Sequence, residues 1–193
     1  MKLLEDAIIE KGTILPGDVL KVNAFLNEKV DPELVEKMAD EWYKLFKDTK
    51  VDKVATIESS GIALALLVAL KFKCELVVAK KGDSTNNDYF TASVFSNTKD
   101  KDFTISVQKG FIREDENILI IDDFLANGSA CEALISIIKY AKANVVGIGV
   151  AIEKEFQDGG KKLREHGYRV ESLAIIQKME YNNHVIVFKH KEG

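Results

Sequence analysis

Short aliphatic segments alternate with longer segments that carry one apolar face, and this alternation from residue 51 to residue 175 limits the folds open to the chain. Runs rich in valine and isoleucine predict strands, and the segments between them predict helices. Strands joined by crossover helices form a parallel sheet with helices on both faces, so the sequence predicts an α/β fold. The predicted strands are 51–57, 75–79, 117–121, 145–152 and 169–175, with helices over 61–72, 129–142 and 160–166.

The segments outside this alternation predict smaller additions to the same sheet. A polar loop over 81–88 precedes two alternating segments, 91–96 and 103–108, which predict a hairpin. A last strand is predicted over 184–188.

The first 35 residues or so predict an appendage. A short amphipathic helix over 2–11 and a short strand over 19–22 precede a helix that starts at Asp31-Pro32, where aspartate caps and proline suits the first helical position. Chains below about 40 residues rarely fold alone, so we expect one domain spanning residues 1–193.

Composition narrows the class of protein. The net charge of −4 gives no sign of a broad nucleic-acid surface, and the longest apolar run, 62–70, is far shorter than the roughly 20 residues of a membrane span. Glu5 and Asp6 stand where a signal peptide needs its apolar stretch. Cys74 and Cys131 lack metal-ligand spacing. We expect a cytoplasmic protein with neither a nucleic-acid nor a membrane partner.

The most informative segment runs from residue 118 to residue 130. Four aliphatic residues are followed by Asp122 and Asp123, and small residues then lead into a predicted helix. Ligands of open α/β sheets bind at the carboxyl ends of strands, and a helix that starts there offers N–H groups to a phosphate. Gly128 permits close approach, Asn127 and Ser129 can donate hydrogen bonds, and the acids suit sugar hydroxyls or Mg²⁺. Together these features describe a phosphoribosyl group.

Five segments, in order, carry a family resemblance: 20–27, 56–63, 91–94, 120–128 and 167–174. In combination they resemble the type I phosphoribosyltransferases, and among these the bacterial purine-salvage enzymes that act on xanthine. The resemblance implies a parallel sheet flanked by helices, with a hairpin loop and a hood of N-terminal and C-terminal segments over the purine site. It implies that xanthine displaces pyrophosphate from 5-phosphoribosyl 1-pyrophosphate (PRPP), giving xanthosine 5′-monophosphate, and that the protein forms a homodimer.

The same resemblance assigns the residues that hold PRPP. Asp122 and Asp123 are the catalytic pair on the ribose hydroxyls. Mg²⁺ is implied as the cofactor, bound with PRPP and with no ligand directly from the protein. The 5′-phosphate loop comprises Ala126, Asn127, Gly128, Ser129 and Ala130, and the pyrophosphate side comprises Glu58, Ser59, Ser60, Gly61, Lys80 and Lys81.

Three further positions match base-binding residues of the family: Leu20 as an apolar wall, Asn27 as a donor and acceptor, and Lys154 as a donor to a purine carbonyl. Many hypoxanthine-guanine relatives carry an acid at the position of Ala126 that assists purine deprotonation. Alanine lacks that function, so another group serves or the purine arrives deprotonated. Xanthine, the most acidic common purine base, is consistent with the second route.

Two alternatives stand beside this interpretation. A non-catalytic regulator of the same fold would bind PRPP as a signal, although the first 50 residues hold no basic cluster typical of an added DNA-binding region. An enzyme with the same chemistry would instead use hypoxanthine, guanine or adenine. We assign no role to the three histidines, His166, His184 and His190, or to the two cysteines.

Overall fold

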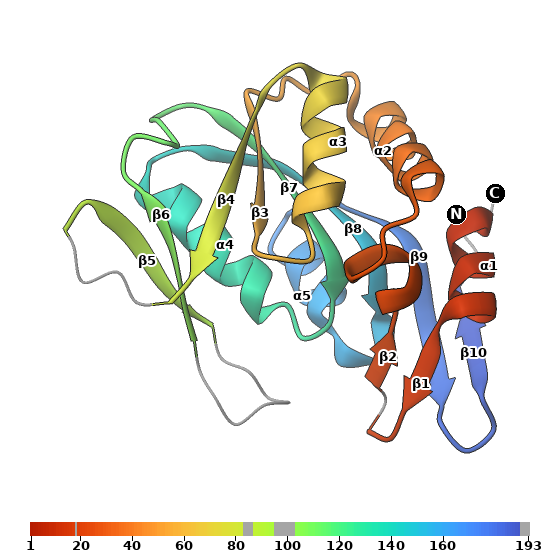
Figure 1. Ribbon diagram of the computed structural model, residues 1–193. Helices are drawn as coiled ribbons and strands as arrows, with labels where there is room; N and C mark the ends of the chain where they lie inside the picture. The colour runs from red at the N-terminus through yellow and green to blue at the C-terminus, as the bar shows by residue number, and fades with distance from the viewer. Residues whose placement is uncertain (18, 83–86, 95–102, 190–193) are drawn as a thin grey trace.

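The computed structural model describes residues 1–17, 19–82, 87–94 and 103–189, and within these ranges an eight-stranded sheet forms the centre of the molecule (Figure 1). The strand order is β10-β9-β8-β7-β3-β4-β6-β5. The inner strands β9, β8, β7, β3 and β4 run parallel, whereas β10, β6 and β5 each run antiparallel to their neighbour. Their bounds are β3 (Lys53–Ile57), β4 (Glu75–Lys81), β5 (Tyr89–Val94), β6 (Phe103–Gln108), β7 (Asn117–Leu125), β8 (Asn144–Lys154), β9 (Val170–Glu180) and β10 (Val185–Phe188).

Helices cover both faces of this sheet, as the alternation predicts. Three helices are crossovers between parallel strands: α3 (Ile62–Phe72), α4 (Ser129–Tyr140) and α5 (Gly159–Glu165). The hydrophobic cluster on one face contains residues of α1 (Lys2–Lys11), α2 (Pro32–Phe46) and α3, including the fully buried Trp42. The cluster on the other face contains residues of α4 and of the β5–β6 hairpin. No helix within the described ranges is long and apolar enough to cross a membrane.

The N-terminal region packs onto the sheet through the same core. It contains α1, the two-stranded pair β1 (Thr13–Leu15) and β2 (Val19–Lys21), and a π-helical turn over Asn23–Asn27. The side chain of Asp31 accepts a hydrogen bond from the Leu34 N–H at 3.2 Å, which confirms the predicted helix cap. Leu20 belongs to the cluster that also holds Ile152 and Ile176, so the appendage lies against β8 and β9.

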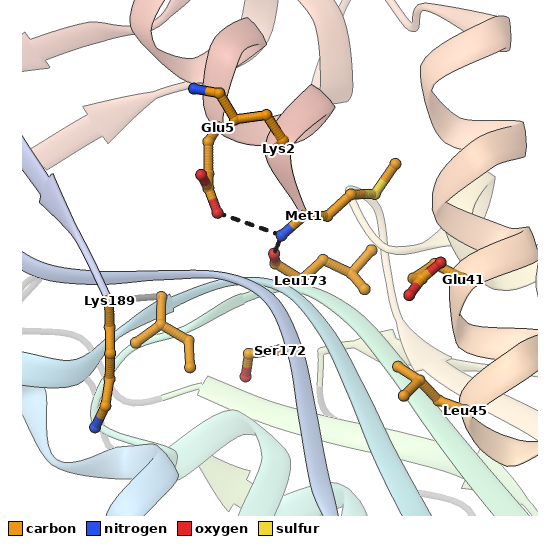
Figure 2. A pocket seen from close by; sticks show the side chains of 9 residues that line it. Met1, Lys2, Glu5, Glu41, Leu45, Ser172, Leu173 and Lys189 are labelled. Carbon is orange, nitrogen blue, oxygen red and sulfur yellow. Dashed lines mark hydrogen bonds and ion pairs between the residues drawn. The ribbon is translucent and has the colours of Figure 1, made fainter. Parts of the chain in front are cut away.

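The first residue is held against the sheet. Figure 2 shows the amino group of Met1 between the Glu5 carboxylate, 3.3 Å away, and the carbonyl oxygen of Leu173 on β9. A pocket of about 320 Å³ lies beside this contact, lined by residues of α1, α2 and β9 and by Lys189. The amino group of Met1 is therefore bound to β9, one of the strands against which the N-terminal region packs.

Most predicted elements are confirmed, and the differences lie at strand ends and in the appendage. β7 runs to Leu125, four residues beyond the predicted end, because it pairs with β8 as far as the Leu125–Glu153 register. β9 likewise extends to Glu180, supported by antiparallel β10. β1 and the π-helical turn were not predicted, and the antiparallel edge strands make the sheet mixed rather than wholly parallel.

Parts of three predictions fall outside the described residues: positions 83–86 of the polar loop, positions 95–96 at the end of the first hairpin strand, and His190. The remainder of the hairpin is confirmed, because Tyr89–Val94 and Phe103–Gln108 pair antiparallel.

Candidate active site at the topological switch point

The strand order has a topological switch point between β3 and β7. From β3 the chain passes through α3 to β4, on one side of β3. From β7, on the other side of β3, the chain continues away from β3 through α4 to β8 and β9. The loops after β3 and β7 therefore diverge from neighbouring strand ends, which is the position where open α/β sheets bind ligands. Residues 58–61 and 126–128 form these two loops, at the same edge of the sheet in Figure 1.

The loop after β7 is shaped to receive a phosphate. Gly128 has φ +90°, a left-handed conformation that L side chains rarely adopt, and it is the cap of α4. The side-chain oxygen of Asn127 accepts a hydrogen bond from the Ser129 N–H at 3.1 Å, which leaves the amide nitrogen of Asn127 as a donor. A helix N-terminus with these neighbours attracts an anion.

The two acids lie on opposite faces of β7. They lie within the strand, whereas the sequence predicts them directly after its end. Asp123 is buried and Asp122 is partly buried, consistent with the alternation of a strand. The Asp123 N–H donates to Oδ1 of Asp122 at 3.0 Å. Burial raises the pKa of the Asp122 carboxyl well above its ordinary value, and the charge of Asp123 raises it further. Asp122 can therefore retain a proton at pH values where ordinary aspartates are charged.

The loop after β3 approaches this pair closely. A Cβ on Gly61 would lie 2.1 Å from Oγ1 of Thr56 and 3.1 Å from Oδ1 of Asp122, so the close packing leaves no room for a side chain. Ser59 is exposed and Ser60 partly buried on the same loop. The Glu58–Ser59 peptide bond is cis. Two of the predicted PRPP segments, 58–61 and 122–123, are thus adjacent.

Glu58 connects the loop to the end of β4. Its carboxylate accepts hydrogen bonds from Lys80 Nζ at 2.8 Å and from the Lys81 N–H at 2.7 Å. The Lys80 ammonium, followed by the Lys81 N–H, lowers the pKa of Glu58. The structure therefore brings Glu58 together with both predicted lysines, and its carboxylate is paired with the Lys80 ammonium and the Lys81 backbone N–H.

The predicted base-binding residues occupy the other side of the β7 end. Leu20 is buried on β2, and Lys154 is the last residue of β8, with 9% of its surface exposed. The ammonium of Lys154 lies 5.9 Å from the centre of the Phe124 ring. Phe124 packs against the hydrophobic cluster to which Leu20 belongs. Asn27 ends the π-helical turn, and its side-chain oxygen is buried with no hydrogen-bond partner among the described residues.

Sequence reasoning missed several residues that shape this site. Phe124 was left out of the predicted site because aromatic side chains more often belong to the core. The strand extends past residue 121, and Phe124 lies beside Lys154. Thr56 is fully buried against Gly61. Gly159 of α5 donates its N–H to the carbonyl oxygen of Ala126 at 3.1 Å. The Gly159-Gly160 pair was the available signal for such a close approach.

A phosphate loop, an adjacent pair of acids and a switch point define an α/β protein built to hold a phosphorylated sugar. The phosphoribosyl transferase domain family matches residues 29–192. The chain is 48% identical to the xanthine phosphoribosyltransferase of Bifidobacterium adolescentis over 98% of this chain and 100% of that one. It is 50% identical to the xanthine phosphoribosyltransferase of Bacillus cytotoxicus, over 93% and 92% of the two chains. The chain belongs to the phosphoribosyltransferase family.

Solved structures agree with this assignment at the level of the fold. The adenine phosphoribosyltransferase of Rhodothermus marinus superposes with a TM-score of 0.76 at 25% identity, over 90% of this chain and 96% of that one. The Giardia lamblia enzyme, complexed with 9-deazaadenine, gives a TM-score of 0.75 at 25% identity over 89% and 96%. The predicted type I phosphoribosyltransferase fold is confirmed.

Proposed function

We propose that this protein is a xanthine phosphoribosyltransferase of purine salvage, which converts xanthine and PRPP to xanthosine 5′-monophosphate and pyrophosphate. The observation that carries the choice of base is Lys154, a buried cation at the carboxyl end of β8, beside Phe124. An ammonium donates to a purine carbonyl oxygen and meets the amino group of adenine with a donor facing a donor. The similarity to curated xanthine enzymes over nearly the whole chain supports the same base.

Electrostatic positioning supplies the chemistry in this proposal. Displacement of pyrophosphate from C1 passes through an electron-poor ribosyl cation, so the site has to hold spreading charge rather than supply a nucleophile. Asp122 and Asp123 hold the ribose hydroxyls, and Ala126 to Ala130 hold the 5′-phosphate at the start of α4. Ser59, Ser60 and Gly61 offer backbone N–H groups to the pyrophosphate, with the charges of Lys80 and Lys81 nearby.

Mg²⁺ fits the donor set as a companion of PRPP. This ion takes one or two carboxylates together with substrate phosphates and waters. Within the described residues no group of three or more histidine, cysteine or acidic side chains is arranged to hold a metal ion. In this proposal Asp122 and Asp123 hold the ribose hydroxyls, and Mg²⁺ would be bound through PRPP oxygens and water without a direct protein ligand. When bound, Mg²⁺ offsets the charge of the leaving pyrophosphate.

The N-terminal region and the C-terminal segment act as a hood over the base within one domain of residues 1–193. Leu20 gives an apolar wall, and Asn27 carries a buried carbonyl oxygen without a partner among the described residues, suited to an N–H of xanthine. Position 126 is an alanine, where many hypoxanthine-guanine relatives carry an acid. Xanthine is acidic enough to arrive as its anion. The missing acid favours xanthine over hypoxanthine or guanine, because xanthine is the most acidic of these bases.

We propose further that the enzyme acts as a homodimer in the cytoplasm. Leu66 and Leu70 on α3 are 49% and 63% exposed, which suits a surface covered by a second copy. The free thiols Cys74 and Cys131 are compatible with a reducing compartment. Sedimentation at micromolar concentration tests the dimer, and an active protein that sediments only as a monomer would contradict it.

The direct test of function supplies purified protein with PRPP, Mg²⁺ and one purine base at a time, with the nucleotide products separated. We expect xanthine to be converted fastest, guanine and hypoxanthine much more slowly, and adenine negligibly, because a site built to bond a carbonyl rejects an analogue without it. Tight PRPP binding with no product from any base would favour the regulatory alternative. Preferred use of adenine would contradict the proposed base pocket.

A further inference from the structure

We propose that Glu153 and Arg164 form a positioning pair that holds the phosphate loop and Lys154 in fixed relation, so that the two ends of the bound nucleotide are held by one rigid unit. The role for Lys154 rests on the proposed function, whereas the role for the phosphate loop does not depend on which base is used. Neither residue was predicted from the sequence.

Glu153 is a buried acid with a complete set of partners. It is 2% exposed, and both terminal nitrogens of Arg164 donate to its two oxygens, each at 2.7 Å. The hydroxyl of Ser172 on β9 donates to the same carboxylate. Burial by itself raises the pKa of Glu153, but the hydrogen bonds from Arg164 and Ser172 outweigh it and the pKa is lowered. The carboxylate is therefore charged and fixed in one orientation.

Contact with α5 carries this fixed geometry to the phosphate loop. A Cβ on Gly160 would lie 1.9 Å from Oε1 of Glu153, so the carboxylate packs directly on the backbone of α5. A Cβ on the preceding residue, Gly159, would lie 2.3 Å from the carbonyl oxygen of Ala126 and 2.6 Å from the nitrogen of Gly128. The start of α5 is thus wedged between the Glu153 carboxylate and the loop that receives the 5′-phosphate.

The same acid fixes the end of β8 that carries Lys154. Glu153 and Lys154 are consecutive in the strand, so their side chains leave opposite faces. On one face Glu153 is tied to Arg164 and Ser172, and on the other Lys154 lies over Phe124. The contacts of Glu153 therefore hold the short backbone from which the Lys154 side chain leaves, and their loss is expected to shift Lys154.

β9 connects this pair with the N-terminal region. Ser172 donates to Glu153, and its neighbour Leu173 accepts the hydrogen bond from the amino group of Met1; Figure 2 shows both residues on β9 beside the pocket. The N-terminal region is therefore attached to Glu153 through consecutive residues of β9, and the phosphate loop is attached to it through the start of α5. This arrangement suits a site in which base and phosphate have to be held at a constant separation.

The test replaces Glu153 with glutamine, which keeps the shape and removes the charge. The matched control is Glu165→Gln, the same change at an exposed position of α5, next to Arg164. Calorimetry with Mg²⁺ and PRPP gives the dissociation constant, and steady-state assays give KM for PRPP and for xanthine. A displacement of about 1 Å can cost about 100-fold, so we expect each constant to rise about 10-fold or more in Glu153→Gln. The control should stay within about two-fold of wild type.

A second pair of variants separates positioning from simple support of the fold. Arg164→Gln should resemble Glu153→Gln, and Arg164→Lys should recover part of the affinity, because lysine keeps the charge but not the two-pronged contact. A residue that only stabilised the fold would lower the melting temperature and the active fraction, with the constants of the folded fraction unchanged.

Each result therefore bears on the proposal. Unchanged dissociation and Michaelis constants in folded Glu153→Gln would overturn it. If that variant does not fold, the same constants are measured in Arg164→Gln and Arg164→Lys, which change a side chain that is 39% exposed. A wild-type protein that binds PRPP but does not use xanthine would contradict the proposed function, and the comparison of PRPP affinities would still test the pair.

Discussion

The two halves of the site are built in different ways. The phosphoribosyl half consists of two loops, 58–61 and 126–130, each following one strand of the switch point, and of the acid pair within β7, where Asp122 lies close to Gly61. The base half combines Leu20 and Asn27 from the N-terminal region with Lys154 from β8. The first half is made mainly of backbone shaped locally, and the second depends on how the N-terminal region docks on the sheet.

This difference predicts that the halves fail separately. Changes in the two loops or the acid pair should affect PRPP whichever base is offered, since the proposed function gives the N–H groups and carboxylates there to the common substrate. Changes at the N-terminal region or Lys154 should affect the base and leave PRPP nearly untouched. The expected effects below are ordered by size, and each one either sharpens or breaks the separation.

The largest effect is expected at the acid pair. Asp122→Asn and Asp123→Asn should each lower kcat/KM for PRPP by roughly 10- to 150-fold, the loss of one charge-assisted hydrogen bond of about 1.5–3 kcal/mol. Steady-state kinetics with PRPP limiting measures this, and Asp48→Asn at an exposed position is the control. Full activity of either variant at limiting PRPP would remove that residue from the site.

The next effect tests how closely the loop 58–61 packs against Thr56 of β3 and Asp122 of β7. Gly61→Ala places a methyl group 2.1 Å from Oγ1 of Thr56, so the loop has to shift, and overpacking of this kind costs about 1–3 kcal/mol. We expect a higher KM for PRPP, measured with each purine that the enzyme accepts.

Thr56→Ala supplies the matched rescue. Oγ1 of Thr56 has no hydrogen-bond partner among the described residues. Its removal therefore breaks no hydrogen bond there and opens space for the new methyl group. The double variant Thr56→Ala with Gly61→Ala should regain PRPP affinity relative to Gly61→Ala alone. No recovery would mean that the loop is not held through this contact.

A smaller effect is expected at Asn27, in the base half. Asn27→Ala removes a carbonyl oxygen suited to one neutral hydrogen bond, worth about 0.5–1.5 kcal/mol, so KM for xanthine should rise roughly 2- to 13-fold. KM for PRPP should stay unchanged, as in the distant control Asn183→Ala. An equal rise for both substrates would break the separation of the halves.

The last of these effects concerns stability. The pKa of Asp122 is raised above its ordinary value of 3.8, chiefly by burial and then by Asp123. Between the two values the folded protein holds a proton that the unfolded chain has lost, so the free energy of unfolding falls as pH rises through that window. Asp122→Asn should remove this fall and make the empty protein more stable than wild type above the window. Melting curves across pH, with Asp48→Asn as control, measure it.

The phosphoribosyl half could be predicted from the sequence because its signals are local. A buried strand, two acids, a small turn and an apolar-faced helix stand in one stretch of chain, and strand order then determines where they meet. The end of β7 was misplaced at residue 121 because two adjacent acids look like the end of a strand. Pairing with β8 carries the strand to Leu125, and Phe124 thereby comes to lie near Lys154.

The supports of the site lay beyond sequence reasoning for a physical reason. Glu153 and Arg164 are ordinary charged residues in the sequence, and only the packing of α5 on β8 turns them into a buried pair. The π-helical turn over Asn23–Asn27 and the short pairing of β1 with β2 depend on contacts with the sheet, which local propensity does not encode. The family resemblance predicted Asn27 and Lys154 as base-binding residues, but it did not predict the residues that hold them in place.

The measurement that tests the separation of the halves most directly is the pair of Michaelis constants of Lys154→Ala. This change removes a buried donor from the base half and leaves both PRPP loops intact. We predict that KM for xanthine rises by roughly 10-fold or more while KM for PRPP stays within about two-fold of wild type. An unchanged KM for xanthine, or an equal rise in both constants, would contradict the account.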